Sequence, residues 1–325
     1  MFLDLRISTH IPMKTISGLL SIDKPEGMTS RQAVTRVKNL LRKVGYGRQI
    51  KVGHCGTLDP LATGILVICV GRSTRLVQMI QEQPKSYSGT IRLGLVTSTD
   101  DCTGEVLAES ELDTENLSRQ AIVDLLPDFT GHIEQVPPKF SAIHVDGKRA
   151  YKLARQGHDV ELEPRPVHIY RLELAGFELP EFKLQIECGS GTYIRSLGRD
   201  IGERLGCGAT MNTLNRSAIG AFSLSNSVTP NQLTPENIES FVEPPITAVS
   251  HLPSYEINEL QKERIYNGRM VEIDTVAALK HAPENGNTAR LILVDNNQQL
   301  VAVSTYRFED RTAKPVMVFH DPPRD

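Results

Sequence analysis

Apolar residues recur with two different spacings along the chain, and each spacing predicts a different kind of secondary structure. An uninterrupted apolar run at 65–70 has the length and composition of a buried strand. Residues 87–93 and 182–188 alternate between apolar and polar positions, which is typical of strands with one face toward a core. Tyr87 lies on the core-facing side of its strand. Residues 16–23 are also predicted to form a strand.

Helical spacing occurs in two further places. Apolar residues within 33–44 recur every three or four positions, and Thr29 with Gln32 forms a capping-box pattern ahead of them. Gly45 follows as a helix stop. Residues 194–205 repeat with the same spacing, so both segments are predicted to be helices with one buried face.

The C-terminal part of the chain is expected to hold a small β-rich unit. Residues 225–251 are rich in proline and polar side chains, and we take the end of this segment as an interdomain linker. Beyond it, predicted strands at 290–294 and 300–307 flank the turn residues 295–298, which indicates a hairpin. A further strand is predicted at 315–319.

Composition narrows the possible function classes only slightly. With 39% hydrophobic and 23% charged residues, the chain is ordinary for a globular protein. It has no stretch of about 18 uninterrupted apolar residues. Asp4 and Arg6 interrupt the N-terminus where a signal peptide needs an apolar core, so we expect a cytoplasmic protein. The five cysteines include no C-x-x-C pair, which argues against a structural zinc site and a disulfide framework.

Charge is distributed unevenly although the net charge is only −3. Residues 23–51 contain eight lysines or arginines and two acids, whereas residues 100–134 contain ten acids and one arginine. This asymmetry favours a basic face that binds nucleic acid and an acidic back. The alternative is that both segments are merely solvated helix faces.

A glycine-rich stretch immediately precedes the apolar run. The three glycines within 53–64 allow unusual backbone angles and close approach, so this stretch is predicted to be a shaped loop. Pro60 biases Asp59 toward an extended conformation, from which its carboxylate can project into a cleft. The alternative is that Asp59 caps a turn, as most Asp-Pro pairs do.

The complete string favours the first interpretation of Asp59. Residues 53–66 match the pattern G-H-x-G-x-L-D-P-x-A-x-G-x-L at every fixed position, which resembles the catalytic motif of the TruB-type tRNA pseudouridine synthases. The resemblance implies that Asp59 is the nucleophile in converting uridine 55 of the tRNA T-loop to pseudouridine. It also implies that His54 fills the space that the flipped base leaves.

The same resemblance implies the fold class. That fold is α+β, with a pseudouridine synthase catalytic domain on a mixed, mostly antiparallel sheet, a thumb insertion, and a small β-rich PUA-like RNA-binding domain. We therefore expect an N-terminal tail at 1–15, a catalytic domain at 16–250 with the thumb at 131–160, and the PUA-like domain at 251–325. Met13 lies close before the first family-like segment and is a candidate alternative start.

Three more blocks assign further residues by resemblance. Residues 23–30 resemble D-K-P-x-G-x-[TS]-S, in which Lys24 is expected to bind substrate or to support the active-site loop. Lys85-Ser86-Tyr87 resembles K-x-Y, whose tyrosine stacks on the target base. Residues 191–202 match G-T-Y-I-R-S-L-x-x-D-[IL]-G, whose arginine pairs with the catalytic aspartate, so Arg195 is the expected partner of Asp59.

The remaining blocks concern the pocket and the thumb. Leu214 takes the apolar pocket position of L-R-R-[TS]-x-x-G-x-F. The thumb-like block P-P-x-x-S-A…G…Y…A-R-x-G carries a predicted hairpin around Asp146-Gly147, and Lys148, Tyr151 and Arg155 are expected to bind the RNA backbone.

Three positions depart from the family patterns. Ser98 replaces a common aspartate in the T-D-T-x-D-x-x-G turn at 97–104, which puts any carboxylate contact there in doubt. His144 replaces a common lysine of the thumb, and Asn215 replaces the first arginine of the L-R-R block.

The implied reaction rearranges one bond and requires neither a cofactor nor a metal, so none is expected. The expected partner is the T stem-loop of tRNA, and we expect a monomer with no obligate protein partner and no membrane contact. Two alternatives remain: a guide-RNA-directed pseudouridine synthase of a ribonucleoprotein, and a non-catalytic tRNA-binding or folding protein. A glycoside hydrolase is less favoured, because its usual mechanism needs a second carboxylate and none matches Asp59.

Overall fold

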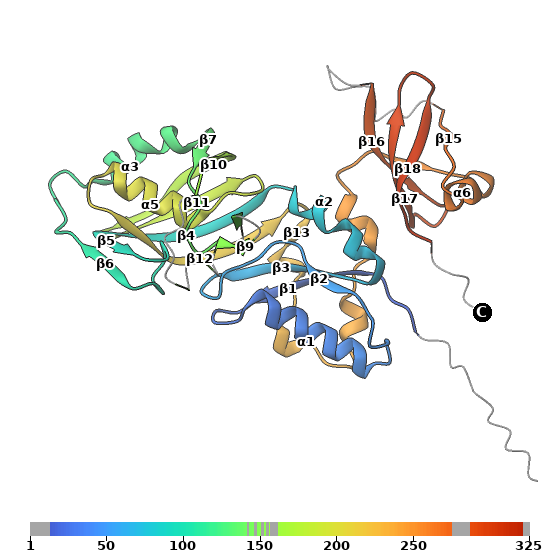
Figure 1. Cartoon of the computed structure of the whole chain (residues 1–325), viewed down its shortest axis with the longest axis horizontal. Coiled ribbons are helices and arrows are strands. Elements are labelled where there is room, and N and C mark those ends of the chain that lie inside the picture. The colour runs from blue at the N-terminus through green and yellow to red at the C-terminus, as the bar shows by residue number, and fades with distance from the viewer. Residues whose placement is uncertain are drawn as a thin grey trace, which may run out of the picture.

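One large mixed sheet runs through residues 18–223 (Figure 1). The protein is described here by a computed structural model that covers residues 14–141, 143–145, 148–150, 153, 156, 162–274 and 287–320. The strands of this sheet are β1 (Gly18–Lys24), β2 (Val52–His54), β3 (Thr63–Val70), β4 (Lys85–Leu93), β7 (Gly131–Gln135), β10 (Arg165–Glu178), β11 (Glu181–Cys188), β12 (Ala209–Ile219) and β13 (Phe222–Ser223).

The order of the strands confirms the predicted fold class. The main path is β1-β3-β12-β4-β11-β10-β7, with β2 added on β3 and β13 added on β12. The pairing of β3 with β12 is parallel, and the other pairings in this sheet are antiparallel. The sheet is therefore mixed and mostly antiparallel.

The apolar run predicted at 65–70 lies in β3, and other parts of the protein cover both faces of this strand. Leu66, Ile68 and Val70 belong to the core cluster beneath α1 (Ser30–Lys43), because alternate side chains of a strand face one side. Ile65 and the other odd-numbered residues belong to a second cluster, which continues into the C-terminal sheet. A strand that is covered on both faces reads as a continuous apolar run rather than as an alternation.

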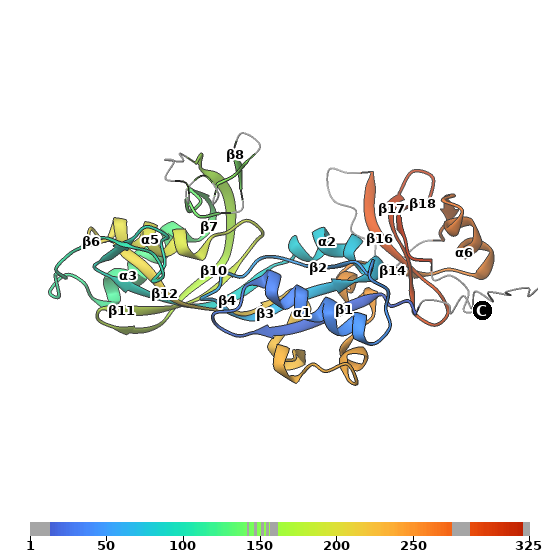
Figure 2. The ribbon, with the colours of Figure 1, turned by 60° about the horizontal axis from the view of Figure 1, so that its bottom comes forward.

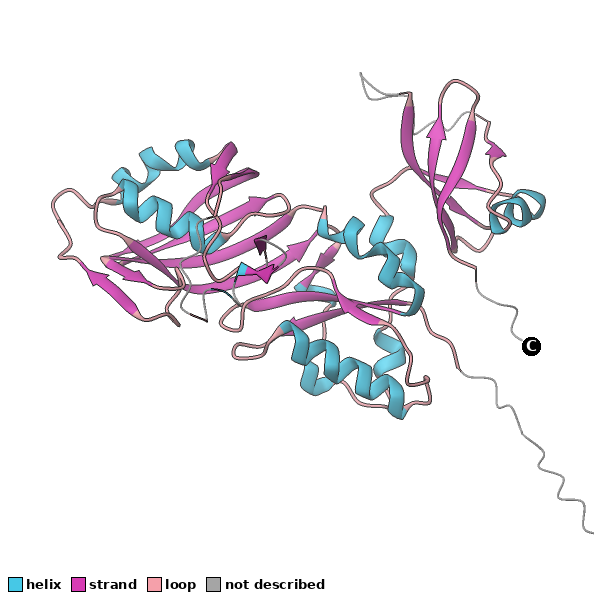
Figure 3. Ribbon diagram, in the orientation of Figure 1, coloured by secondary structure: helices cyan, strands magenta, loops and turns pink. Residues whose placement is uncertain are grey.

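The predicted helices are present, and both lie against the first core cluster (Figure 3). Thr29 and Gln32 form a complete capping box at the start of α1, and Gly45 follows its end with a φ of 103°. α5 (Ile194–Arg204) buries Ile194, Leu197 and Ile201 on the other half of the sheet. Shorter helices are α2 (Val77–Gln81), α3 (Arg119–Leu125) and α6 (Glu259–Tyr266).

The C-terminal unit is β-rich, as expected. Its five strands run in the order β14-β16-β17-β18-β15, with α6 alongside, and they are β14 (Ser254–Glu256), β15 (Val271–Glu272), β16 (Thr288–Val294), β17 (Leu300–Arg307) and β18 (Thr312–Val318). Ile292 and Phe319 pack in one cluster with Met79 of α2. An ion pair of 3.0 Å between Arg290 and Glu82 adds to this contact. Whether the unit is PUA-like stays a prediction.

The segment 225–251, whose end is predicted to be an interdomain linker, packs against the sheet before that end. Val228 donates its backbone N–H to Ser21 and accepts from Asp23 (both 3.0 Å), and Glu243 exchanges two backbone hydrogen bonds with Leu19 (2.8 and 2.9 Å). Val228 is itself buried in the first core cluster. The segment therefore packs along β1, which its proline-rich composition did not reveal.

The acidic stretch at 100–134 is only partly helical, because helix α3 occupies just Arg119–Leu125. In its N-terminal part, β6 (Val106–Glu109) pairs with the preceding strand β5 (Leu95–Thr97) in a two-stranded ribbon.

The predicted thumb hairpin is present within the insertion. β8 (His144–Val145) pairs antiparallel with β9 (Lys148–Arg149). Figure 2 shows β8 standing out from the sheet beside β7 and β10. Tyr151 and Arg155 lie outside the described residues, and so does Met13. Among the helices that the structure describes, none is long and apolar enough to cross a membrane.

Candidate active site

Asp59 lies on the loop between β2 and β3, and neighbouring elements hold this loop. Ser30, the first residue of α1, donates its hydroxyl to Leu58 O (3.0 Å) and accepts from the Leu58 N–H (2.9 Å). Gly27 donates its N–H to Pro60 O at 2.8 Å. The residues on both sides of Asp59 are thus fixed, while about a third of its side chain remains exposed (34%).

Arg195, in the first turn of α5, contacts the Asp59 carboxylate. Its Nε lies 3.0 Å from Asp59 Oδ2, and its side chain is 7% exposed. The same guanidinium donates to Thr99 O (2.8 Å) and to Phe140 O at the base of the thumb (3.2 Å). The structure therefore brings together the two residues that the resemblance pairs, and it connects both to two further loops.

Asp101 is a site residue that the sequence reasoning missed. Its Oδ2 lies 3.5 Å from Arg195 Nη1, and its side chain is 5% exposed. Its other oxygen accepts from the Thr103 N–H (3.0 Å) and from the Thr99 hydroxyl (2.8 Å), so the carboxylate is held in place. The signal was present, because Asp101 is the fixed second aspartate of the T-D-T-x-D-x-x-G turn.

The departure at Ser98 leaves this turn intact. The Ser98 hydroxyl accepts the Glu105 N–H at 3.0 Å across the β5–β6 connection. A hydroxyl acceptor thus bridges the turn in the position where the family pattern has an aspartate.

Tyr87 and Leu214 form the apolar wall of the site. Tyr87 points into the core from β4 with 7% exposure, and Leu214 lies on the neighbouring strand β12 with the same exposure. Gly89 lies opposite Leu214 in the β4–β12 register, and a Cβ at this position would be in ordinary van der Waals contact with Leu214 Cδ1 at 3.5 Å. Burial raises the pKa of Tyr87, which keeps its hydroxyl protonated at neutral pH.

Arg216 is a second buried arginine that the sequence reasoning did not assign. It is 1% exposed and lies opposite Tyr87 in the β12–β4 register. Its Nε donates to Ile65 O (2.9 Å) and its Nη2 donates to Gly56 O (3.1 Å), and its positive charge opposes the rise that burial causes in the pKa of Tyr87. In the described part of the chain no carboxylate lies within 4.0 Å of it.

The ammonium group of Lys24 points into the protein, whereas a residue that binds RNA presents its charge at the surface. Its side chain is fully buried, and its ammonium donates to Pro25 O (2.9 Å), Met28 O (2.7 Å) and Pro60 O (3.3 Å). Burial lowers its pKa to about 8. The structure thus favours support of the Asp59 loop over substrate binding, because the charged group is already surrounded by backbone carbonyls.

The remaining predicted residues lie around this centre or outside the described set. His54 ends β2 on the same loop as Asp59, and burial, followed by the charge of Arg216, lowers its pKa. Lys148 lies in β9 of the thumb hairpin, where only its backbone is described. Asn215 donates its side-chain amide to the Thr63 hydroxyl at 2.8 Å, which ties β12 to the end of the loop.

Comparisons with known proteins point to one family. Residues 42–194 match the model described as TruB family pseudouridylate synthase, N-terminal domain, and residues 195–243 match the tRNA pseudouridylate synthase B C-terminal domain. The tRNA pseudouridine synthase B of Clostridium tetani is 40% identical, over 79% of this chain and 86% of its own length. That of Prochlorococcus marinus is 35% identical, over 93% and 97%.

Solved structures agree on the fold. The chain in a Cbf5-Nop10-Gar1 complex superimposes with a TM-score of 0.68 at 25% identity, covering 93% of this chain and 84% of that one. A chain of an H/ACA ribonucleoprotein bound to a substrate RNA gives a TM-score of 0.69 at 23% identity, covering 95% and 86%. The second likeness concerns the fold alone.

Proposed function

The chain belongs to the TruB family of pseudouridylate synthases, and on this premise we propose that Asp59 is its nucleophile and uridine 55 of the tRNA T-loop its target. Its activity is that of a tRNA pseudouridine synthase, an isomerase. In the reaction the bond between uracil N1 and ribose C1′ breaks and a bond between C5 and C1′ forms. C5 loses a proton and N1 gains one, so the atoms balance.

The contact between Arg195 and Asp59 is the observation that carries this proposal. The ion pair holds the carboxylate in one orientation, which positions it for attack as the nucleophile. Arg195 is almost fully buried, whereas the Asp59 side chain is 34% exposed, so the carboxylate stays open to an incoming nucleotide.

Asp101 completes the charge arrangement in our proposal. With Asp59 and Asp101 both at the guanidinium, Arg195 keeps one buried carboxylate partner when Asp59 attacks and its negative charge decreases. Since the Asp101 carboxylate is fixed by the 99–103 turn, Arg195 retains its orientation throughout the reaction.

In our proposal the flipped base lies against Tyr87 and Leu214, the apolar wall of the site. A uridine within a folded loop must leave its stack before its glycosidic bond can be reached. Tyr87 then offers its ring to the uracil and Leu214 closes the pocket behind it, while His54, neutral because its pKa is lowered, fills the vacated position. The thumb, whose base is tied to Arg195 through Phe140 O, holds the RNA over the site.

We propose that the protein acts without a guide RNA and as a monomer. The curated relatives that match most of its length are named tRNA pseudouridine synthase B and are 35–42% identical to it. The structural neighbours from ribonucleoprotein complexes are more distant, at 23–25% identity.

Turnover on RNA alone tests the proposed function. The purified protein is incubated with a T stem-loop RNA that carries tritium at C5 of uridine, and the released tritium is counted. We expect release without any added guide RNA or protein, and no release when the uridine equivalent to position 55 is replaced by cytidine. Tight binding of the RNA with no release would contradict the proposal and favour the guide-directed or non-catalytic alternatives.

A further inference from the structure

A continuous basic surface covers the exposed side of α1 and the turn after it, and it lies apart from the residues of the catalytic centre. We call it the α1 basic face. Its members are Arg31, Lys38, Arg42, Lys43 and Arg48, and apart from the half-buried Lys38 all are exposed. Helix α1 itself contains no acid.

The cations of this surface lack acidic partners. In the described part of the chain, no carboxylate lies within 4.0 Å of these five side chains. The nearby Glu239 is already engaged by Lys14 and by the Tyr46 hydroxyl (2.8 Å). The exposed Glu236 lies near enough to Lys43 for the lysine to lower its pKa, after the larger effects of hydrogen bonds from Thr234 and its own backbone. The other four cations of the face have no comparable carboxylate in the described part of the chain, although the net charge of the protein is −3.

The face begins at the catalytic loop and leads away from it. Ser30 at the start of α1 is hydrogen-bonded to Leu58, next to Asp59, and the helix continues for 14 residues. At a rise of 1.5 Å per residue, the far end lies about 20 Å from the loop. In the sheet, α1 packs on the β1–β3 edge, whereas the thumb follows β7 at the opposite edge. An RNA held between thumb and loop therefore has the α1 basic face beyond it.

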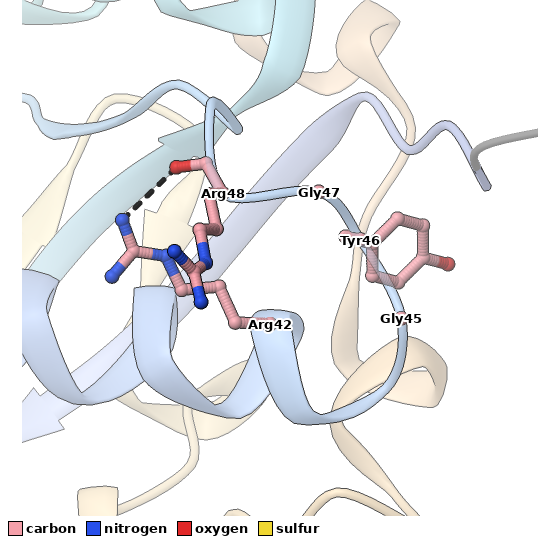
Figure 4. A pocket seen from close by; sticks show the side chains of 5 residues that line it. All are labelled: Arg42, Gly45, Tyr46, Gly47 and Arg48. Carbon is pink, nitrogen blue, oxygen red and sulfur yellow. Dashed lines mark hydrogen bonds between the residues drawn. The ribbon is translucent and has the colours of Figure 1, made fainter.

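Two hollows on this face suit phosphate groups. Along the helix, Arg31, Thr35, Asn39 and Lys43 line a groove of about 600 Å³. At its end, Arg42 and Arg48 line a pocket of about 520 Å³ with Gly45, Tyr46 and Gly47. Figure 4 shows the side chains of Arg42 and Arg48 next to each other, with Arg42 donating to Arg48 O (3.0 Å) and the Tyr46 hydroxyl pointing away.

Two adjacent guanidinium groups without a carboxylate between them repel each other unless an anion joins them. Guanidinium groups bind phosphate oxygens in two-pronged fashion, and backbone phosphates dominate the affinity of proteins for nucleic acids. The negative end of the α1 dipole weakens anion binding there. Lys43, Arg42 and Arg48 together carry three full positive charges, which outweigh the partial negative charge at the end of the helix.

We propose that the α1 basic face binds the phosphate backbone of tRNA outside the T stem-loop, with one phosphate held between Arg42 and Arg48. This inference rests on the proposed function, because it names a second contact for the same RNA substrate. The catalytic loop and thumb select the uridine, and the α1 basic face adds affinity for the body of the tRNA without reading its sequence.

Salt-dependent binding tests the proposal with an Arg42→Gln and Arg48→Gln double variant. Binding is measured in the Asp59→Asn background against full-length tRNA and against the isolated T stem-loop, over a range of salt concentrations. For full-length tRNA we expect weaker binding and a salt slope smaller by about 1, because one phosphate contact is lost. For the stem-loop we expect no change in affinity or in the salt slope. When Asp59 is intact, we also expect the double variant to turn over the stem-loop at the wild-type rate.

A matched control is an Arg92→Gln and Lys183→Gln double variant, which removes two exposed cations from strands β4 and β11. It should leave the slope for full-length tRNA at the wild-type value. Equal slopes for the Arg42/Arg48 variant, the control and the wild type would overturn the inference, as would a loss on the stem-loop as large as that on full-length tRNA. Failure of the proposed function itself is distinguishable, because the wild type would then release no tritium from the stem-loop.

Discussion

Gly64 lies directly against the backbone of Arg216 where β3 and β12 pair in parallel. A Cβ on Gly64 would lie 2.3 Å from Arg216 O, and the residue has a φ of 100°, a region that other residues rarely adopt. The glycine at the end of the catalytic motif therefore permits β12, which carries Leu214 and Arg216, to approach the Asp59 loop.

Gly64→Ala should destabilise the protein, because both the backbone conformation and the close approach are lost. We expect the free energy of unfolding to fall by at least about 1–3 kcal/mol, measured by urea denaturation. Gly53→Ala is the matched control, since no atom lies within 4 Å of a Cβ there and its φ is ordinary. Equal stability of the two variants would contradict this explanation of the motif.

Asp101→Asn should slow turnover without abolishing RNA binding. The substitution removes one of the two carboxylates at Arg195, whose guanidinium then keeps Asp59 as its carboxylate partner beside the Thr99 and Phe140 carbonyls. We expect kcat to fall about 10- to 100-fold, the equivalent of one charged hydrogen bond, in single-turnover kinetics. Asp113→Asn, on an exposed turn, is the control; a reduction in affinity at unchanged kcat would refute the positioning role.

Arg216 and Tyr87 should be energetically coupled. If Arg216 orients the Tyr87 hydroxyl, Arg216→Lys will lower kcat more in the wild type than in a Tyr87→Phe background. A double-mutant cycle should give a coupling of about 0.5–3 kcal/mol, as contacting residues do. Additive effects in the cycle would show that Arg216 only supports the loop through its bonds to Ile65 O and Gly56 O.

Two buried lysines predict a pH dependence of stability. Burial lowers the pKa of Lys24 and of Lys85 to about 8 from 10.5. Between these pH values the unfolded chain holds a proton that the folded chain has released. The free energy of unfolding should therefore rise with pH in this window, by up to about 1.4 kcal/mol per pH unit for each lysine.

Lys85→Met removes one of these two contributions, so the rise between pH 8 and 10.5 should be shallower than in the wild type. Lys183→Met, on the exposed side of β11, should leave the rise unchanged. Thermal or urea unfolding across this pH range measures how the free energy of unfolding of each variant changes with pH. Identical slopes for Lys85→Met and the wild type would mean that Lys85 is not linked to folding.

Local patterns predicted most of the fold and one part of the site. The apolar run of β3, the capping box at Thr29 and the alternation around Tyr87 each depend on residues close in sequence, and all three are present. The pairing of Asp59 with Arg195 followed from motif resemblance, since no pattern relates residues so far apart.

The features missed depend on distant contacts. Arg216 donates to residues about 150 positions earlier, and an arginine on a strand looks the same in sequence whether it is buried or exposed. The segment around Val228 packs on β1 through backbone hydrogen bonds, which side-chain composition does not encode. Resemblance predicted that Lys24 either binds substrate or supports the active-site loop, and the three carbonyls around its ammonium, which local sequence does not show, favour support of the loop.

The most direct test of the central claim compares the wild type with Asp59→Asn on tritium-labelled T stem-loop RNA. Asparagine retains the shape of the side chain but cannot act as the nucleophile, so tritium release should be abolished while the affinity for the RNA stays within a few-fold of the wild type. Release at a rate comparable with the wild type would contradict the assignment of Asp59 and, with it, the account of the site.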